Sequence, residues 1–268
     1  PPPIKHFVIN LKRRPDRLEN FWKIIPRNLV DKIEHFEAVD GKKISLKMLN
    51  STQVAEKQSS EGDKNENKKE KSHPELENTF NILSQTKKLN SGEIGCFLSH
   101  SVLWKNLLKE KDCELYFVFE DDVVFENDFE EAYSVFQEDV LKSYSVCEKE
   151  SGILLYFGGR FSSKFVTKSN LLEPKKSEDF QKKPYSIRDY KKSVGRNAFN
   201  RMHFDRTTHA YVINKKAAQV LVENIQDPLD LQVDHYIRKV MQTQRVMTFV
   251  PLACYSKLNG DTDIQNCT

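Results

Sequence analysis

The sequence predicts an α/β domain with a central, mostly parallel sheet flanked by helices. Short apolar runs of strand length alternate along the chain with longer segments whose apolar residues recur at helical spacing. Some of the short runs end in an acidic residue or a glycine turn, which marks the end of a strand. Strands that alternate with helices are typical of parallel sheets covered by helices.

The N-terminal part of the chain contains two predicted strands and one helix. The apolar residues 4–11 predict a buried first strand. Pro15 is placed to open a helix that extends to about Asn28, since proline fits the first helical turn. Residues 35–41 predict a second strand that ends in an acid and a turn glycine.

The middle of the chain continues the alternation. An apolar face predicts a helix over residues 92–111, and the apolar run at 115–120 predicts a central strand. A polar pair that could serve as a helix cap precedes the apolar pattern of a further helix over 129–140. Residues 153–157 predict another buried strand before a glycine turn.

The C-terminal part adds two strands and two helices. Residues 209–214 predict a strand and residues 215–224 a helix. A second helix is expected over 231–241, and a last strand over 246–250.

We expect these elements to form one domain that spans residues 1–268. A Lys-rich stretch at about 51–73 is almost free of apolar side chains and predicts a solvated, flexible insertion. Residues 160–206 are polar and basic, and predict a long loop region over a functional site.

The composition excludes some classes of protein. The 42 Lys and Arg nearly balance 39 Asp and Glu, and the net charge of +3 argues against a nucleic-acid partner. No apolar run approaches the roughly 20 residues of a membrane span, and no signal segment follows the first prolines. The five cysteines form no Cys-x-x-Cys pair, which favours reduced thiols in a cytoplasmic setting over a zinc site, with one disulfide left open.

The most informative motif is the carboxylate triplet Glu120-Asp121-Asp122, which lies between two apolar runs. Buried carboxylates need a cationic partner, and a hard divalent cation is the simplest one. Such a cluster at the end of a central strand suits metal-assisted handling of a phosphorylated substrate, and so favours a nucleotide-dependent enzyme. Strand alternation predicts Glu120 and Asp122 on one side and Asp121 on the other. The alternative is an acidic turn that pairs with a lysine.

Polar residues also follow the first two strands. Asn10, Leu11, Arg14 and Arg17 come directly after the first, and an arginine fork suits contacts to phosphate or uracil. Asp40, after the second strand, would help to hold the same nucleotide. The alternative is that the arginines only solvate an amphipathic helix.

The helix over 92–111 begins with two glycines that allow close backbone approach, Gly92 and Gly95. Ser99 and His100 follow, and these side chains could reach a donor ribose or an acceptor. For His100 the alternative is a histidine satisfied within the core.

One carboxylate stands out in the C-terminal helix region. Asp234 interrupts an apolar run, and a carboxylate that faces a cleft could deprotonate an acceptor hydroxyl. His235 is a rival base, because histidine ordinarily titrates nearer to neutral pH. The alternative is an aspartate on the helix surface.

Taken together, these stretches resemble glycosyltransferase family 25, which includes bacterial lipooligosaccharide galactosyltransferases and collagen-type hydroxylysine galactosyltransferases. The matching motifs, in chain order, are Val8-Ile9-Asn10-Leu11-x-x-Arg14-x-Asp16-Arg17, Gly92-Glu93-Ile94-Gly95-Cys96-x-x-Ser99-His100 with Trp104, Glu120-Asp121-Asp122, His209-Ala210-Tyr211-x-Ile213 with Ala217-Ala218, Val233-Asp234-x-Tyr236 and Asp263-Ile264. The ordered set is specific, although each motif alone is not.

The resemblance implies a GT-A type fold, a UDP-sugar donor, a divalent metal (Mn²⁺ or Mg²⁺) and inversion at the anomeric carbon. The residues that this interpretation assigns are Asp234 as the catalytic base, Asp122 and Glu120 as metal ligands, and Asn10, Leu11, Arg14, Arg17, Asp40, Ser99, His100, Glu120 and Asp121 as donor contacts. Galactose is the first candidate sugar, with glucose and N-acetylglucosamine behind it. The expected acceptor is a glycan, a glycolipid or a hydroxylysine of a collagen-like protein.

Two rival functions remain open. One is a non-catalytic adhesion or scaffold protein of the same fold. The other is a nucleotidyltransferase, disfavoured by the lack of a phosphate-cradling G-x-x-x-x-G-K-[ST] motif. The expected location is the cytoplasm, with peripheral membrane contact for a glycolipid acceptor, or the secretory lumen if a signal precedes this sequence.

Overall fold

The computed structural model describes residues 2–43, 89–125, 129–137, 152–157, 159–161, 204–225, 231–243, 247–249 and 254–256. The predicted Lys-rich insertion at 51–73 lies outside the described residues, as do most of the predicted 160–206 loop region and the closing Asp263-Ile264 motif. The two ends of the 160–206 region form strands β6 (Gly159–Phe161) and β7 (Phe204–Arg206), which pair with each other in antiparallel fashion.

Six strands form the central sheet and confirm the predicted α/β class. In order across the sheet, they are β2 (Ile33–Glu37), β1 (Ile4–Asn10), β3 (Leu115–Glu120), β8 (Ala210–Asn214), β5 (Ile153–Tyr156) and β9 (Met247–Phe249). Three of the five pairings are parallel, whereas β8 runs antiparallel to both of its neighbours. The carboxyl ends of β1, β2 and β3 therefore share one edge with the amino end of β8.

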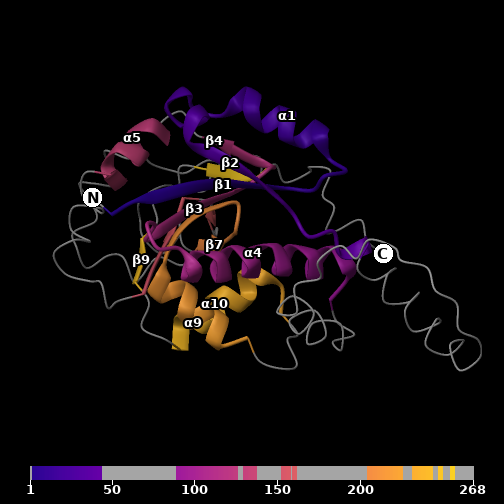
Figure 1. The fold of residues 1–268 in the computed structure, drawn as a ribbon, viewed down its shortest axis with the longest axis vertical. Coiled ribbons are helices and arrows are strands. Elements are labelled where there is room, and N and C mark those ends of the chain that lie inside the picture. The colour runs from indigo at the N-terminus through magenta and orange to yellow at the C-terminus, as the bar shows by residue number, and fades with distance from the viewer. Residues whose placement is uncertain are drawn as a thin grey trace, which may run out of the picture.

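Helices cover both faces of the sheet (Figure 1). On one face lie α1 (Pro15–Ile24) and α5 (Phe129–Val135), and on the other α4 (Ser91–Lys109), α9 (Lys215–Glu223) and α10 (Val233–Thr243). Side chains of β3 alternate between the two layers, so that Phe117 packs with the α1 and α5 layer and Val118 with the α4 layer. Because β3 is buried on both faces, its end at Glu120 is where the strand meets the polar edge of the sheet.

Local signals explain why the first helix is shorter than predicted. It ends at Ile24 and not near Asn28, because Ile25 precedes a proline and is extended. A 3-10 helix, η1 (Arg27–Lys32), then leads into β2.

The start of α4 is set by a reciprocal cap that the sequence interpretation overlooked. Asn90 Oδ1 accepts a hydrogen bond from the Glu93 backbone N–H at 2.9 Å, and Glu93 Oε2 accepts one from the Asn90 N–H at 2.8 Å. This capping box satisfies donors that would otherwise be unpaired, so the helix begins at Ser91. A further strand, β4 (Val123–Phe125), was not predicted and pairs with β10 (Cys254–Ser256).

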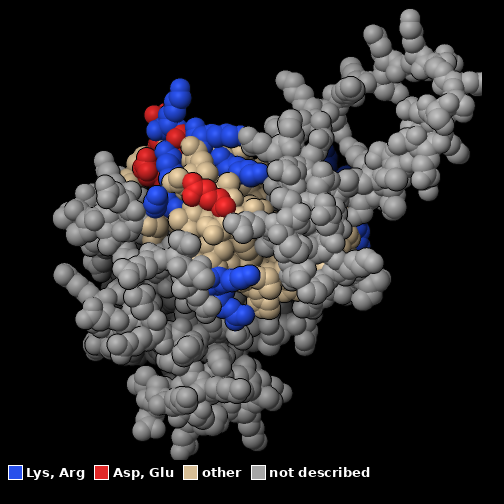
Figure 2. Space-filling view, turned by 90° about the horizontal axis from the view of Figure 1, so that it is seen from below, with Lys and Arg blue, Asp and Glu red and all other residues tan. Residues whose placement is uncertain are grey.

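The described surface carries mixed charge. On the face drawn in Figure 2, described acidic and basic side chains lie near one another. None of the helices in the described ranges is both long enough and apolar enough to cross a membrane.

A buried histidine in β1 predicts acid-sensitive stability. His6 Nε2 lies 2.8 Å from the Tyr133 hydroxyl, and burial, with a smaller contribution from Lys32, lowers the pKa of His6 to about 4. Since an unfolded histidine titrates near 6.5, the unfolded chain binds the proton more readily, and stability falls as the pH drops from about 6.5 to about 4. We expect His6 to account for a loss of about 2 kcal/mol between pH 7 and pH 5.

Urea unfolding of the wild type and of His6→Gln at both pH values measures this contribution. Glutamine keeps a polar group beside Tyr133 but does not titrate, so the variant should lose about 2 kcal/mol less than the wild type over this range. An equal loss in both proteins would contradict the prediction.

Candidate functional site

A cleft lies where the carboxyl ends of β1 and β3, the turn after β2 and the first turns of α4 come together. Most of the predicted site residues line it: Asn10, Leu11, Arg17, Asp40, Ser99, His100, Glu120, Asp121 and Asp122. Arg14 and Asp234 are not among the lining residues, and Arg13, Gly92 and Cys96 are. The carboxyl edge of the sheet is where ligands bind in open α/β folds.

Asp121 is held by β1 and α1. Its Oδ2 accepts a hydrogen bond from Asn10 Nδ2 at 2.6 Å, and its Oδ1 lies 2.5 Å from Arg17 Nη2. Burial raises the pKa of Asp121 to about 6, against the opposing effects of Arg17 and Asn10. Asp121 therefore ties the end of β3 to the neighbouring strand and helix.

The triplet is grouped as predicted but for a different reason, because β3 ends at Glu120, and Asp121 and Asp122 form a turn. Glu120 and Asp122 belong to one set of possible ligands, whereas Asp121 pairs with Asn10 and Arg17, and all three residues line the cleft. Arg17 contacts both aspartates, with Nη2 lying 3.2 Å from Asp122 Oδ2. The cationic neighbour is thus partly an arginine, where the sequence interpretation considered a metal ion or a lysine.

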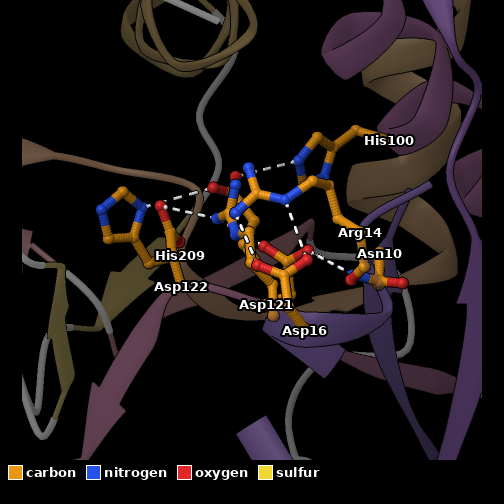
Figure 3. Close-up of polar contacts among 9 residues, drawn as sticks. Asn10, Arg14, Asp16, His100, Asp121, Asp122 and His209 are labelled. Carbon is orange, nitrogen blue, oxygen red and sulfur yellow. Dashed lines mark hydrogen bonds and ion pairs between the residues drawn. The ribbon is translucent and has the colours of Figure 1, made fainter. Parts of the chain in front are cut away.

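Glu120 contacts two histidines, both labelled in Figure 3. His100 Nε2 is 3.2 Å from Oε1, and His209 Nδ1 is 3.5 Å from Oε2. Burial alone would raise the pKa of Glu120, but the hydrogen bond from His100 and the close approach of His209 outweigh it and hold the pKa well below its usual range. The carboxylate is therefore ionised and available as a ligand.

Asp122 is only partly neutralised. Its Oδ2 faces Arg17, but its Oδ1 is buried and has no hydrogen-bond partner among the described residues. A buried carboxylate oxygen without a partner carries a desolvation cost that a bound cation would remove.

Asp122 also belongs to a set of side chains that fits a divalent cation. Glu120, Asp122 and His209 each offer one ligand atom, and these atoms lie within 4.8 Å of one another. Two carboxylate oxygens and one imidazole nitrogen suit a metal such as Mn²⁺. The residues present therefore fit the metal that the sequence predicts.

Arg13 and the backbone of the turn after β2 hold the Asp40 carboxylate in place. Arg13 Nε lies 3.1 Å from its Oδ2, and the Lys42 backbone N–H donates to its Oδ1 at 3.2 Å. Ser99 Oγ accepts a hydrogen bond from the Val39 N–H at 2.9 Å. In this structure Ser99 thus holds the turn that carries Asp40.

The glycines of this region allow the turn to touch α4. A Cβ atom on Gly95 would lie 2.7 Å from the Val39 carbonyl oxygen and 2.8 Å from the Gly41 nitrogen, and one on Gly41 would lie 1.8 Å from the Ser91 carbonyl oxygen. These are backbone atoms, so a side chain could be accommodated only by moving the turn away from α4. The predicted close backbone approach at the start of α4 is confirmed at Gly95.

Gly95→Ala should therefore displace the Asp40 turn. We expect a loss of about 1–3 kcal/mol in the free energy of unfolding, as for overpacked sites. Asn106→Ala, at an exposed position of the same helix, is the matched control and should be neutral or stabilising. Urea unfolding compares the two variants, and equal stability would show that the turn does not depend on Gly95.

Two predicted residues lie outside the cleft lining. The Arg14 guanidinium pairs with Asp16, with Nη2 2.8 Å from Oδ2. Asp234 lies in the first turn of α10, where its Oδ1 accepts a hydrogen bond from the His235 N–H at 2.8 Å. Gln232, two residues before Asp234, donates a hydrogen bond to Glu93 in the first turn of α4, so the start of α10 lies beside the α4 end of the cleft. The His235 side chain is exposed.

The sequence interpretation missed His209 and Arg13 as site residues. His209 precedes β8, and its carbonyl oxygen accepts a hydrogen bond from the Glu120 N–H at 2.9 Å. The signal for His209 was its place in the His209-Ala210-Tyr211 motif. For Arg13 the only signal was its position directly after the first strand.

Comparison with known proteins gives one family match and partial relatives. The family model described as glycosyltransferase family 25 (LPS biosynthesis protein) matches residues 4–237. Procollagen galactosyltransferase 2 of Mus musculus is 30% identical over 137 residues, which are 51% of this chain and 18% of that protein. Inactive glycosyltransferase 25 family member 3 of Homo sapiens is 34% identical over 157 residues, which are 57% of this chain and 21% of that protein.

The chain thus spans about a fifth of the length of these two relatives. Among solved structures, the crystal structure of 4-diphosphocytidyl-2C-methyl-D-erythritol synthase from Anaerococcus prevotii DSM 20548 aligns with 96% of this chain and 88% of that chain. Its sequence identity is 13% and its TM-score 0.35.

Proposed function

The chain belongs to glycosyltransferase family 25, and from this membership we propose that it is an inverting, metal-dependent glycosyltransferase. It transfers a hexose, with galactose as the first candidate, from a UDP-sugar to an acceptor hydroxyl. The α/β fold, with a mostly parallel central sheet flanked by helices, is compatible with the GT-A type that the resemblance implied.

The observation that carries the proposal is the buried Asp122 Oδ1 beside Glu120 and His209. This oxygen has no hydrogen-bond partner among the described residues, and the three side chains can offer ligand atoms within 4.8 Å of one another. A fold retained only as a scaffold gains nothing from such an oxygen, because its desolvation cost lowers stability. A divalent cation held by these three side chains would remove that cost by giving the Asp122 carboxylate a positive partner.

Each residue of the cleft has a role in this proposal. Glu120, Asp122 and His209 would hold the cation, which when bound would stabilise the negative charge that develops on the departing UDP. Asn10 and Arg17 keep the Asp121–Asp122 turn in place. Arg13 and Asp40 flank the cleft at the turn after β2, where they would contact the nucleotide.

The proposal also assigns a catalytic base and two classes of acceptor. Asp234 would take the proton from the acceptor hydroxyl, as an inverting reaction needs one base and no covalent sugar–enzyme intermediate. The names of the family and of its mouse relative support two acceptor classes, a lipopolysaccharide-type glycan and a hydroxylysine of a collagen-like chain. A glycolipid acceptor would place the protein at a membrane surface, and a collagen-like acceptor in the secretory lumen.

One relative supports a second candidate function. The human relative that is 34% identical is named inactive, so a non-catalytic member of the family is a specific alternative. Such a protein would bind neither UDP-sugar nor metal in this cleft, or would bind them without release of UDP.

Release of UDP from a panel of UDP-sugars, with Mn²⁺ and with EDTA, tests the proposal. We expect slow hydrolysis of one sugar even without an acceptor, at least about 10-fold faster with Mn²⁺ than with EDTA, because the cation stabilises the leaving group. If no sugar is hydrolysed, the binding of UDP-sugars is measured next. The absence of both hydrolysis and binding would favour the non-catalytic alternative.

A further inference from the structure

Glu120 belongs to two clusters of possible ligands, and its two carboxylate oxygens face different histidines. Oε2 faces His209 at 3.5 Å, on the side of the Asp122 cluster. Oε1 faces His100 at 3.2 Å, on the side of α4. Figure 3 shows the two histidines on opposite sides of the carboxylates.

The α4 side contains a thiol. Cys96 Sγ, a ring nitrogen of His100 and a Glu120 oxygen lie within 4.8 Å of one another, and all three residues line the cleft. The separation of 3.2 Å between His100 Nε2 and Glu120 Oε1 is close to that of two ligands on one tetrahedral cation, for which bonds of about 2.0–2.1 Å are usual. A thiolate and a carboxylate would together neutralise a divalent cation.

The surroundings of His100 suit either a hydrogen bond or a metal bond at Nε2. His100 Nδ1 lies 2.9 Å from the Tyr211 hydroxyl, and this hydroxyl accepts a hydrogen bond from Trp104 Nε1 at 3.1 Å. The hydroxyl can donate to Nδ1, which leaves a proton on Nε2 for Glu120, or accept from Nδ1, which leaves the Nε2 lone pair for a cation. A second-shell partner of this kind fixes the ring of a metal-bound histidine.

We propose that Cys96, His100 and Glu120 Oε1 form a second cation site, which takes a borderline or soft divalent cation such as Zn²⁺. It differs from the Glu120, Asp122 and His209 set by its sulfur ligand, which hard cations such as Mg²⁺ do not favour. Three protein ligands leave a fourth position open to water from the cleft. The proposal does not rest on transferase activity.

Binding at this site displaces one proton. The thiol is partly buried and lies near several carboxylates, and both the desolvation and the negative charges raise its pKa well above the usual value, so the sulfur is protonated before the cation arrives. The sulfur–metal bond forms as the S–H bond breaks, and the proton leaves to solvent. His100 would bind the cation through Nε2, with Nδ1 donating to the Tyr211 hydroxyl.

Cobalt titration of the folded protein tests the proposal, because a thiolate bound to Co²⁺ gives a charge-transfer band in the near ultraviolet. We expect this band in the wild type at one Co²⁺ per chain, its loss in Cys96→Ser, and its removal by stoichiometric Zn²⁺. Cys113→Ser is the matched control, because Cys113 is buried elsewhere and its thiol donates to the Leu115 carbonyl oxygen. This variant should keep the band.

Asp122→Ala separates this site from the first cation site. The band should survive in Asp122→Ala, even where Mn²⁺ binding is lost and even if the protein proves to be non-catalytic. A band that is missing in the wild type, that persists in Cys96→Ser, or that disappears with Asp122 would overturn the proposal. In the last case the cobalt ion would lie in the Glu120, Asp122 and His209 set.

Discussion

Asp122→Ala should abolish metal-dependent release of UDP and leave the fold as stable as the wild type, or slightly more stable. The carboxylate supplies one of the three proposed ligands, and even the loss of a group that only supports a ligand typically weakens metal binding about 10–100-fold. We therefore expect Mn²⁺ affinity to fall by more than about 100-fold.

The stability argument comes from the two oxygens of Asp122. Oδ1 is buried without a hydrogen-bond partner among the described residues, so its removal relieves a desolvation cost. Oδ2 is 3.2 Å from Arg17, but Arg17 keeps its shorter contact of 2.5 Å to Asp121. We expect the free energy of unfolding to stay the same or to rise by up to about 1 kcal/mol.

Asp16→Ala is the control for the change in charge. Asp16 is exposed, pairs with Arg14 and does not line the cleft, so its removal should leave both metal binding and UDP release unchanged. Mn²⁺ titration, UDP release and urea unfolding of the three proteins complete the comparison. Full metal-dependent activity in Asp122→Ala would refute the metal assignment, and a stability loss above about 2 kcal/mol would identify Asp122 as a structural partner of Arg17 instead.

Features that depend on local sequence could be predicted for this chain. The length of the apolar runs predicted β1 and β3, and Pro15 predicted the start of α1. The predicted ends of the strands then gave the positions of the polar residues that follow the strands. Because the carboxyl ends of parallel strands share an edge, Asn10, Asp40 and Glu120 were expected together, and all three line the cleft.

Features that depend on strand direction or on the path of a turn could not be predicted. A buried strand shows the same apolar pattern in either direction. Within a mostly parallel sheet, a residue that precedes a strand would be expected at the edge away from Glu120. His209 reaches Glu120 only because β8 is antiparallel to β3. Similarly, spacing alone could not decide that Arg13 lines the cleft while Arg14 pairs with Asp16.

Asp234→Asn should preserve donor binding and lower turnover by about 10²–10⁴-fold, the usual contribution of a general base. Asparagine keeps the oxygen that accepts the His235 N–H, so the first turn of α10 should be unchanged. Since Asp234 is not among the residues that line the cleft, the dissociation constant for the UDP-sugar should stay within about 2-fold of wild type, a difference of less than 1 kcal/mol.

The position of Asp234 is the reason to expect an effect on turnover and not on donor binding. Gln232, the residue before α10, donates a hydrogen bond to Glu93 at the start of α4. The charge of Asp234 also contributes to the raised pKa of Cys96. A base that serves the acceptor belongs beside the donor cleft and not within it. His235→Gln is the matched variant, because the adjacent side chain is exposed and is the rival base. If His235→Gln loses turnover and Asp234→Asn retains it, the roles of the two residues must be exchanged.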